Sequence, residues 1–104
     1  MEAQQQTGRC WLKAELHRLE GIALVGLGRL DEGQNDFEEA LRVARMQQAK
    51  AYELRAAVSL VRLWSEQGRR AKARDLLAPV YGWFTEGFDT ADLKEAKALL
   101  DQLA

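Results

Sequence analysis

The architecture is most clearly indicated by the segment Gly21-Ile22-Ala23-Leu24-Val25-Gly26-Leu27-Gly28-Arg29-Leu30-Asp31-Glu32-Gly33, because its pattern returns forty residues later. The dipeptide Gly28-Arg29 reappears as Gly68-Arg69. The same offset aligns Leu24 with Trp64, Gly33 with Ala73, Phe37 with Leu77, and Ala40 with Val80. A helical hairpin that recurs at a fixed period cannot bury its apolar face alone, so neighbouring copies stack. The repeat therefore predicts an all-α fold of stacked antiparallel hairpins.

Helical periodicity and an abundance of good helix formers predict the individual elements. A first helix over about residues 9–27 places five apolar side chains on one stripe, namely Leu12, Leu16, Leu19, Ala23 and Leu27. Asp31 is the expected N-cap of a second helix, which ends near residue 47. A third helix over about residues 50–67 ends at Gly68, a glycine suited to a left-handed C-cap.

The C-terminal part is predicted to hold two more helices. One begins near residue 71 and contains Pro79, which should either kink it or restart it. The other is capped by Asp89 or Thr90 and turns four apolar side chains to one side, Leu93, Ala96, Leu100 and Leu103. We expect the 104 residues to form a single domain, with hairpins over 9–47 and 50–82 and a capping helix over 89–103.

The opening segment resembles the tetratricopeptide repeat, a helical hairpin of protein-binding proteins. The resemblance rests on Gly21, Leu24, Gly28, Gly33, Phe37 and Ala40, and in the second copy on Leu60, Trp64, Gly68, Ala73 and Leu77. The chain departs from the family pattern at Glu20, Gly33, Val61 and Val80, and it lacks the closing proline at Arg45. Its forty-residue offset also exceeds the family period of about 34. The resemblance implies stacked hairpins with a concave binding face.

The stretch from Ala73 to Leu100 resembles the extreme C-terminus of large bacterial signalling proteins. Those proteins combine an ATPase module and a helical-repeat tail with either a class III adenylate/guanylate cyclase domain or a winged-helix DNA-binding domain. The resemblance implies that the chain is a fragment of such a protein and acts as a non-catalytic regulatory module. Neither the cyclase carboxylates nor a phosphate loop lies in this sequence, so no catalytic residue carries over.

Composition narrows the classes of function. The chain is 47% hydrophobic and 30% charged, with a net charge of -1, as expected of a soluble globular domain. No run approaches the ~20 apolar residues of a membrane span, and no secretory signal is visible, so we expect a cytoplasmic protein. The neutral balance argues against a general nucleic-acid binder. A basic stretch over 54–74 and an acidic one over 75–104 could attract each other within one fold or between copies.

Candidate chemical sites are few, and we expect no cofactor and no metal. Cys10 and His17 lie seven residues apart on one predicted helix and supply at most half of a metal site. Gly26-Leu27-Gly28 follows a helix rather than a strand and lacks the ending of a phosphate loop. Glu38 and Glu39 are adjacent on a helix, so their carboxylates point apart.

A partner-binding groove is the main functional prediction. In the repeat family that the chain resembles, the first helix of each hairpin lines the concave face. The register assigns ten residues to that face, namely Glu15, Arg18, Ile22, Val25, Gly26, Arg55, Val58, Arg62, Ser65 and Glu66. The candidate groove residues among them are Arg18, Ile22, Val25, Arg55, Val58, Arg62 and Glu66. Arg55 and Arg62 flank an apolar step, which suits an acidic or C-terminal peptide. The alternative is that Arg55 only pairs with acids of neighbouring helices.

The two ends of the stack carry further expectations. Tyr81, Trp83, Phe84 and Phe88 should either seal one end or form an exposed partner patch. At the other end, Trp11, Leu12 and Leu16 lack a stacking neighbour if the chain belongs to a longer array, and a homodimer could supply one. The expected partner is a protein or peptide, another domain of the parent chain, or a second copy. A stand-alone helical enzyme, a ligand-binding bundle and a structural spacer are the alternatives.

Overall fold

The computed structural model describes residues 2–85 and 90–103, with side chains from residue 12 onward. These residues form α1 (Glu2–Gly26), α2 (Leu30–Met46), α3 (Lys50–Glu66), α4 (Arg70–Gly82) and α5 (Ala91–Leu103). They contain no strand, so the predicted all-α class is confirmed. The first helix begins well before the predicted residue 9. None of the helices in the described ranges has the length and apolarity that crossing a membrane would need.

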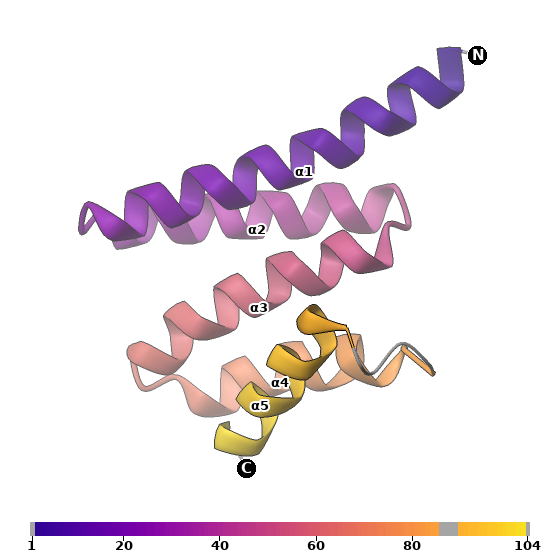
Figure 1. Cartoon of the computed structure of the whole chain (residues 1–104). Helices are drawn as coiled ribbons and strands as arrows, with labels where there is room; N and C mark the ends of the chain where they lie inside the picture. The colour runs from indigo at the N-terminus through magenta and orange to yellow at the C-terminus, as the bar shows by residue number, and fades with distance from the viewer. Residues whose placement is uncertain (1, 86–89, 104) are drawn as a thin grey trace.

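The helices stack as antiparallel hairpins. α1 packs along α2 and α3 packs along α4, while contacts between α2 and α3 join the two hairpins. α5 packs against both α3 and α4. In Figure 1, α1, α3 and α5 lie toward the viewer, and α2 and α4 lie behind them. α1, α3 and α5 therefore share one face of the stack.

The main core runs through the middle of this stack and ends under α5. Its largest fully buried side chains are Leu54, Leu60, Val61 and Leu77. Burying a side chain of this kind contributes about 1.5–3 kcal/mol. α5 adds Leu93, Ala96 and Leu103 to the same cluster, and Leu100 packs against it. The fifth helix thus closes the core with the face that the sequence predicted.

One kind of turn joins the first four helices. Gly28, Gln48 and Gly68 have left-handed φ angles of 84°, 53° and 79°. The amide that follows each of them donates to the carbonyl five residues earlier, from Arg29 to Leu24, from Ala49 to Ala44 and from Arg69 to Trp64. This is the hydrogen bond of the Schellman C-cap. The role predicted for Gly68 is confirmed, and the matching turn at Gln48 was missed because its residue is not glycine.

The tight turn explains why Asp31 is not an N-cap. α2 begins at Leu30, so Arg29 occupies the cap position, and its side chain makes no capping hydrogen bond. The prediction of Asp31 is therefore wrong, and this residue lies in the first turn, where its charge favours the helix dipole. At α5 the predicted cap is present, since Thr90 Oγ1 accepts the Leu93 amide at 3.4 Å. The alternative cap, Asp89, lies outside the described residues.

α4 does not restart at Pro79. The helix runs from Arg70 to Gly82 with Pro79 inside it. The carbonyls of Pro79 and Val80 both accept the amide of Trp83 and close the last turn. Proline removes one helical hydrogen bond, and so close to the helix end this loss is small beside the packing of Leu77 and Val80 in the core.

The aromatic residues after α4 divide between core and surface. Tyr81 and Phe84 are partly buried against the main core. Trp83 is 56% exposed, although its ring meets that of Phe84 edge-on at 5.2 Å. Lys50 Nζ lies 5.1 Å from the centroid of the Trp83 ring. Phe88 lies outside the described residues, so the segment supplies part of an end cap together with one exposed aromatic ring.

The apolar stripe predicted on α1 faces solvent. The exposed fractions are 59% for Leu12, 57% for Leu16, 50% for Leu19 and 73% for Leu27. The corresponding face of α3 is buried, because Ala56 and Leu63, forty residues after Leu16 and Ala23, are 1% and 3% exposed. α3 lies between α2 and α4, whereas α1 packs only against α2 and α3. The stripe is thus a stacking face without a neighbouring helix in the described chain. The side chain of Trp11, which was predicted to belong to the same end of the stack, lies outside the described residues.

Candidate partner-binding groove

A hollow of about 290 Å³ lies on the face shared by α1, α3 and α5, and we call it the groove. Seven of the ten residues predicted for the concave face line it. These are Arg18, Ile22 and Val25 from α1, and Arg55, Val58, Arg62 and Glu66 from α3. The other lining residues are Phe37 from α2, Ser59 and Leu63 from α3, and Asp92 and Glu95 from α5. Glu15, Gly26 and Ser65, which were also predicted for this face, are not among the lining residues.

The floor of the groove is apolar and rigidly held. Phe37, Val58 and Leu63 line it and belong to the main core, each with at most 6% of its surface exposed. Ile22 stands at the edge of this floor and is 46% exposed. Close packing holds core side chains in their rotamer minima, so the floor is formed before any partner binds. An apolar group of a partner could be buried against this floor, out of contact with water, without any change in the fold.

Ion pairs tie the rim of the groove together. Arg55 Nη1 lies 3.0 Å from Glu15 Oε1, and Arg55 Nε lies 3.2 Å from Asp92 Oδ2. One guanidinium on α3 therefore links α1 to α5. Arg18 Nε donates to Glu15 at 2.8 Å, and Arg62 pairs with Glu95 of α5. The acidic C-terminal stretch thus meets the basic middle of the chain inside one fold.

These ion pairs shift the pKa values of Glu15 and Arg55. Burial alone would raise the pKa of Glu15, but hydrogen bonds and charge from Arg18 and Arg55 outweigh it and hold this pKa below the usual 4.5. The hydrogen bond to Asp92 raises the pKa of Arg55 further above its usual value. Both groups stay charged at neutral pH.

The groove carries balanced charge rather than a basic field. Arg18, Arg55 and Arg62 are matched by three lining acids, Glu66, Asp92 and Glu95. The pairing of Arg55 with acids of neighbouring helices, predicted as the alternative to ligand binding, is therefore present. An acidic peptide would have to compete with these acids, so the apolar floor is the feature that favours binding.

No family model, curated protein or solved structure matches this chain. The groove must therefore be interpreted from its own residues. Its lining residues include no histidine or cysteine, which leaves it without the soft ligands of a metal centre.

Asp92 and Glu95 were not predicted for the groove, although their i, i+3 spacing in an acidic stretch was a usable signal. The side chain of Cys10, which with His17 was judged to supply at most half of a metal site, lies outside the described residues.

Proposed function

We propose that the chain is a non-catalytic protein-interaction module whose groove receives a segment of a partner protein. The observation that supports this most is the composition of the groove, a fixed apolar floor under a rim of paired charges supplied by three helices. Recognition surfaces for peptides and helices commonly combine an apolar anchor with a polar rim.

The size of the groove favours an anchoring side chain over a small-molecule ligand. Pockets for drug-sized ligands range over roughly 300–1,000 Å³, and this one is about 290 Å³ and open to solvent. We propose that a large aliphatic or aromatic side chain of the partner occupies it. Flanking charges of both signs on that partner would pair with Arg55, Arg62 and Glu66 at the rim.

The wider setting of this function follows from the resemblances of the sequence. We propose that the module is the tetratricopeptide-like tail of a larger bacterial signalling or regulatory protein in the cytoplasm. Docking on the groove would then bias a distant catalytic or DNA-binding module. Asp92 and Glu95 are paired with arginines at the rim, which supports a binding surface more than the alternative of a stand-alone helical enzyme.

A peptide-display selection tests the groove directly. Ser59 lines it and is half-buried, so Ser59→Trp should fill the hollow while the fold remains. Ser65→Trp is the matched control, since Ser65 is a half-buried serine of the same helix that does not line the groove. Peptides selected on the native chain should carry one large apolar residue between charges, bind Ser65→Trp normally and fail on Ser59→Trp. Equal binding to both variants, or no enrichment, would overturn the proposal.

A further inference from the structure

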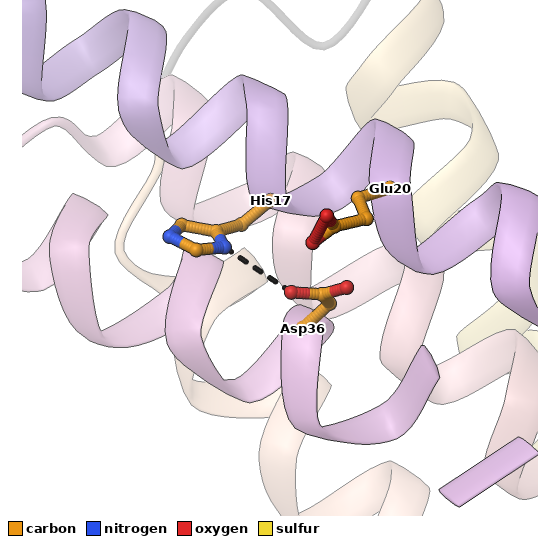
Figure 2. A group of neighbouring side chains, drawn as sticks. All are labelled: His17, Glu20 and Asp36. Atoms are coloured by element: carbon orange, nitrogen blue, oxygen red, sulfur yellow. Dashed lines mark hydrogen bonds and ion pairs between the residues drawn. The ribbon is translucent and has the colours of Figure 1, made fainter. Parts of the chain in front are cut away.

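A second cluster of ionisable groups lies outside the groove, between α1 and α2. His17 and Glu20 are three residues apart on α1, and Asp36 lies opposite them on α2. One potential ligand atom from each residue lies within 4.8 Å of the other two. Figure 2 shows the imidazole and both carboxylates converging between the two helices. His17 is the single histidine of the chain.

The spacing of these atoms suits one small cation. His17 Nδ1 and Asp36 Oδ1 are 3.2 Å apart. Two ligand atoms at 2.0–2.2 Å from a tetrahedral ion would lie about 3.3–3.6 Å from each other, so this pair needs almost no movement. Glu20 is exposed, and in Figure 2 its carboxylate already faces that of Asp36. A small rotation brings the third ligand into place.

The electrostatics of the cluster favour an added positive charge. Among the described residues, no lysine or arginine pairs with Glu20 or Asp36, and the one ion-pair partner of Asp36 is His17. Two neighbouring carboxylates with one imidazole beside them form an arrangement that can hold a divalent cation.

We infer that His17, Glu20 and Asp36 form a binding site for a divalent first-row transition metal, of which Zn²⁺ is the best fit. Imidazole nitrogen favours zinc and its neighbours over Mg²⁺ and Ca²⁺, which prefer oxygen ligands alone. Three protein ligands leave the remaining coordination positions to water. The bound ion would cross-link α1 to α2 and so stiffen the hairpin that carries Arg18, Ile22 and Val25.

Calorimetric titration of the full chain with Zn²⁺ at neutral pH tests the site. We expect one ion per chain, a rise in the midpoint of thermal unfolding, and a shift of the only histidine resonances in the NMR spectrum. His17→Ala and Asp36→Asn should each weaken binding by at least about tenfold, a loss of roughly 1.4 kcal/mol. Glu20→Gln should also weaken binding, and because this side chain is exposed the substitution should leave the fold undisturbed.

Two control variants separate this site from other modes of binding. Glu38→Gln removes an exposed acid of α2 outside the cluster and should bind Zn²⁺ normally. Cys10→Ser should also bind normally. No binding at roughly millimolar Zn²⁺, unchanged affinity in Glu20→Gln and Asp36→Asn, or loss of binding only in Cys10→Ser would each overturn the proposal. None of these readouts depends on the groove or its partner.

Discussion

Gly21 of α1 and Gly33 of α2 approach each other so closely that a Cβ atom on either would lie 3.0 Å from the carbonyl oxygen of the other. The added atom at Gly21 would also lie 2.6 Å from Cε1 of Phe37, and the one at Gly33 would lie 2.6 Å from Cγ2 of Val25. The two glycines thus set the separation of the first hairpin. Because Val25 and Phe37 also line the groove, this separation helps to determine its shape.

Substituting either glycine should therefore destabilise the fold, although alanine is the better helix former. We expect Gly21→Ala and Gly33→Ala each to lower the free energy of unfolding by about 1–3 kcal/mol, the usual cost of overpacking. Gly26→Ala is the control, because a Cβ there meets nothing within 4 Å. Urea unfolding of the three variants measures this, and a stabilised Gly33→Ala would contradict it.

The left-handed turn at Gln48 predicts a stabilising substitution. Gln48 has a φ of 53°, a conformation that glycine adopts without steric cost. We expect Gln48→Gly to raise the free energy of unfolding by up to about 1 kcal/mol. Gly68→Ala, at a φ of 79°, should lower it by a similar amount. Thermal and urea unfolding would check both signs, and a destabilised Gln48→Gly would show that the Gln48 side chain makes a needed contact.

Removing the rim arginines should affect partner binding more than folding. Arg55 and Arg62 are largely exposed, so the double variant Arg55→Ala, Arg62→Ala should lose no more than about 1 kcal/mol per ion pair. Affinity for groove-selected peptides should fall, because the rim around the floor is lost. Arg42→Ala with Arg69→Ala is the control. If the double variant binds every selected peptide normally, the rim takes no part in recognition and a spacer role gains support.

The lowered pKa of Glu15 predicts a dependence of stability on pH. The ionised carboxylate is favoured in the folded state, so its contribution is complete above 4.5 and disappears as the pH falls through the folded pKa. Native protein should be more stable than Glu15→Gln at neutral pH, and the difference should shrink in acid. Urea unfolding at a series of pH values measures this difference. A gap that stays constant down to strongly acidic pH would refute the role given to Arg18 and Arg55.

The exposed leucines of α1 predict self-association of the isolated chain. Leu12, Leu16 and Leu19 lie along one side of the helix and are each at least 50% exposed. Burying a leucine contributes about 1.5–3 kcal/mol, so a second copy should cover this stripe. Analytical ultracentrifugation should find a dimer that Leu16→Glu converts to monomer, with Ala78→Glu on the exposed side of α4 as control. A native chain that stays monomeric at high concentration would contradict it.

Much of the fold could be predicted from the sequence because the forty-residue repeat is carried by local signals. The glycine at 68 and the apolar spacing of α3 and α5 fixed helix ends and buried faces. The errors arose where tertiary context decided the outcome. The stripe of α1 has helical spacing but no neighbour, and Gln48 adopts a glycine conformation because the two hairpins must join there.

The groove was predictable to the extent that it follows helix register. Arg18, Ile22 and Val25 were placed correctly beside Arg55 and Val58 because α1 and α3 are equivalent helices. The acids of α5 and the cluster at His17 could not be found in this way. Asp36 lies 19 residues from His17, and only the close crossing of α1 and α2 brings them together.

The left-handed turns at positions 28, 48 and 68 recur every twenty residues, so α2 and α3 form two successive steps of opposite orientation. Evolution or design could insert two steps together and simply extend the concave surface. An odd number would exchange front and back, so that side chains downstream of the insertion would leave the recognition surface altogether. Length variation in such a chain should consequently be tolerated in even multiples and selected against in odd ones.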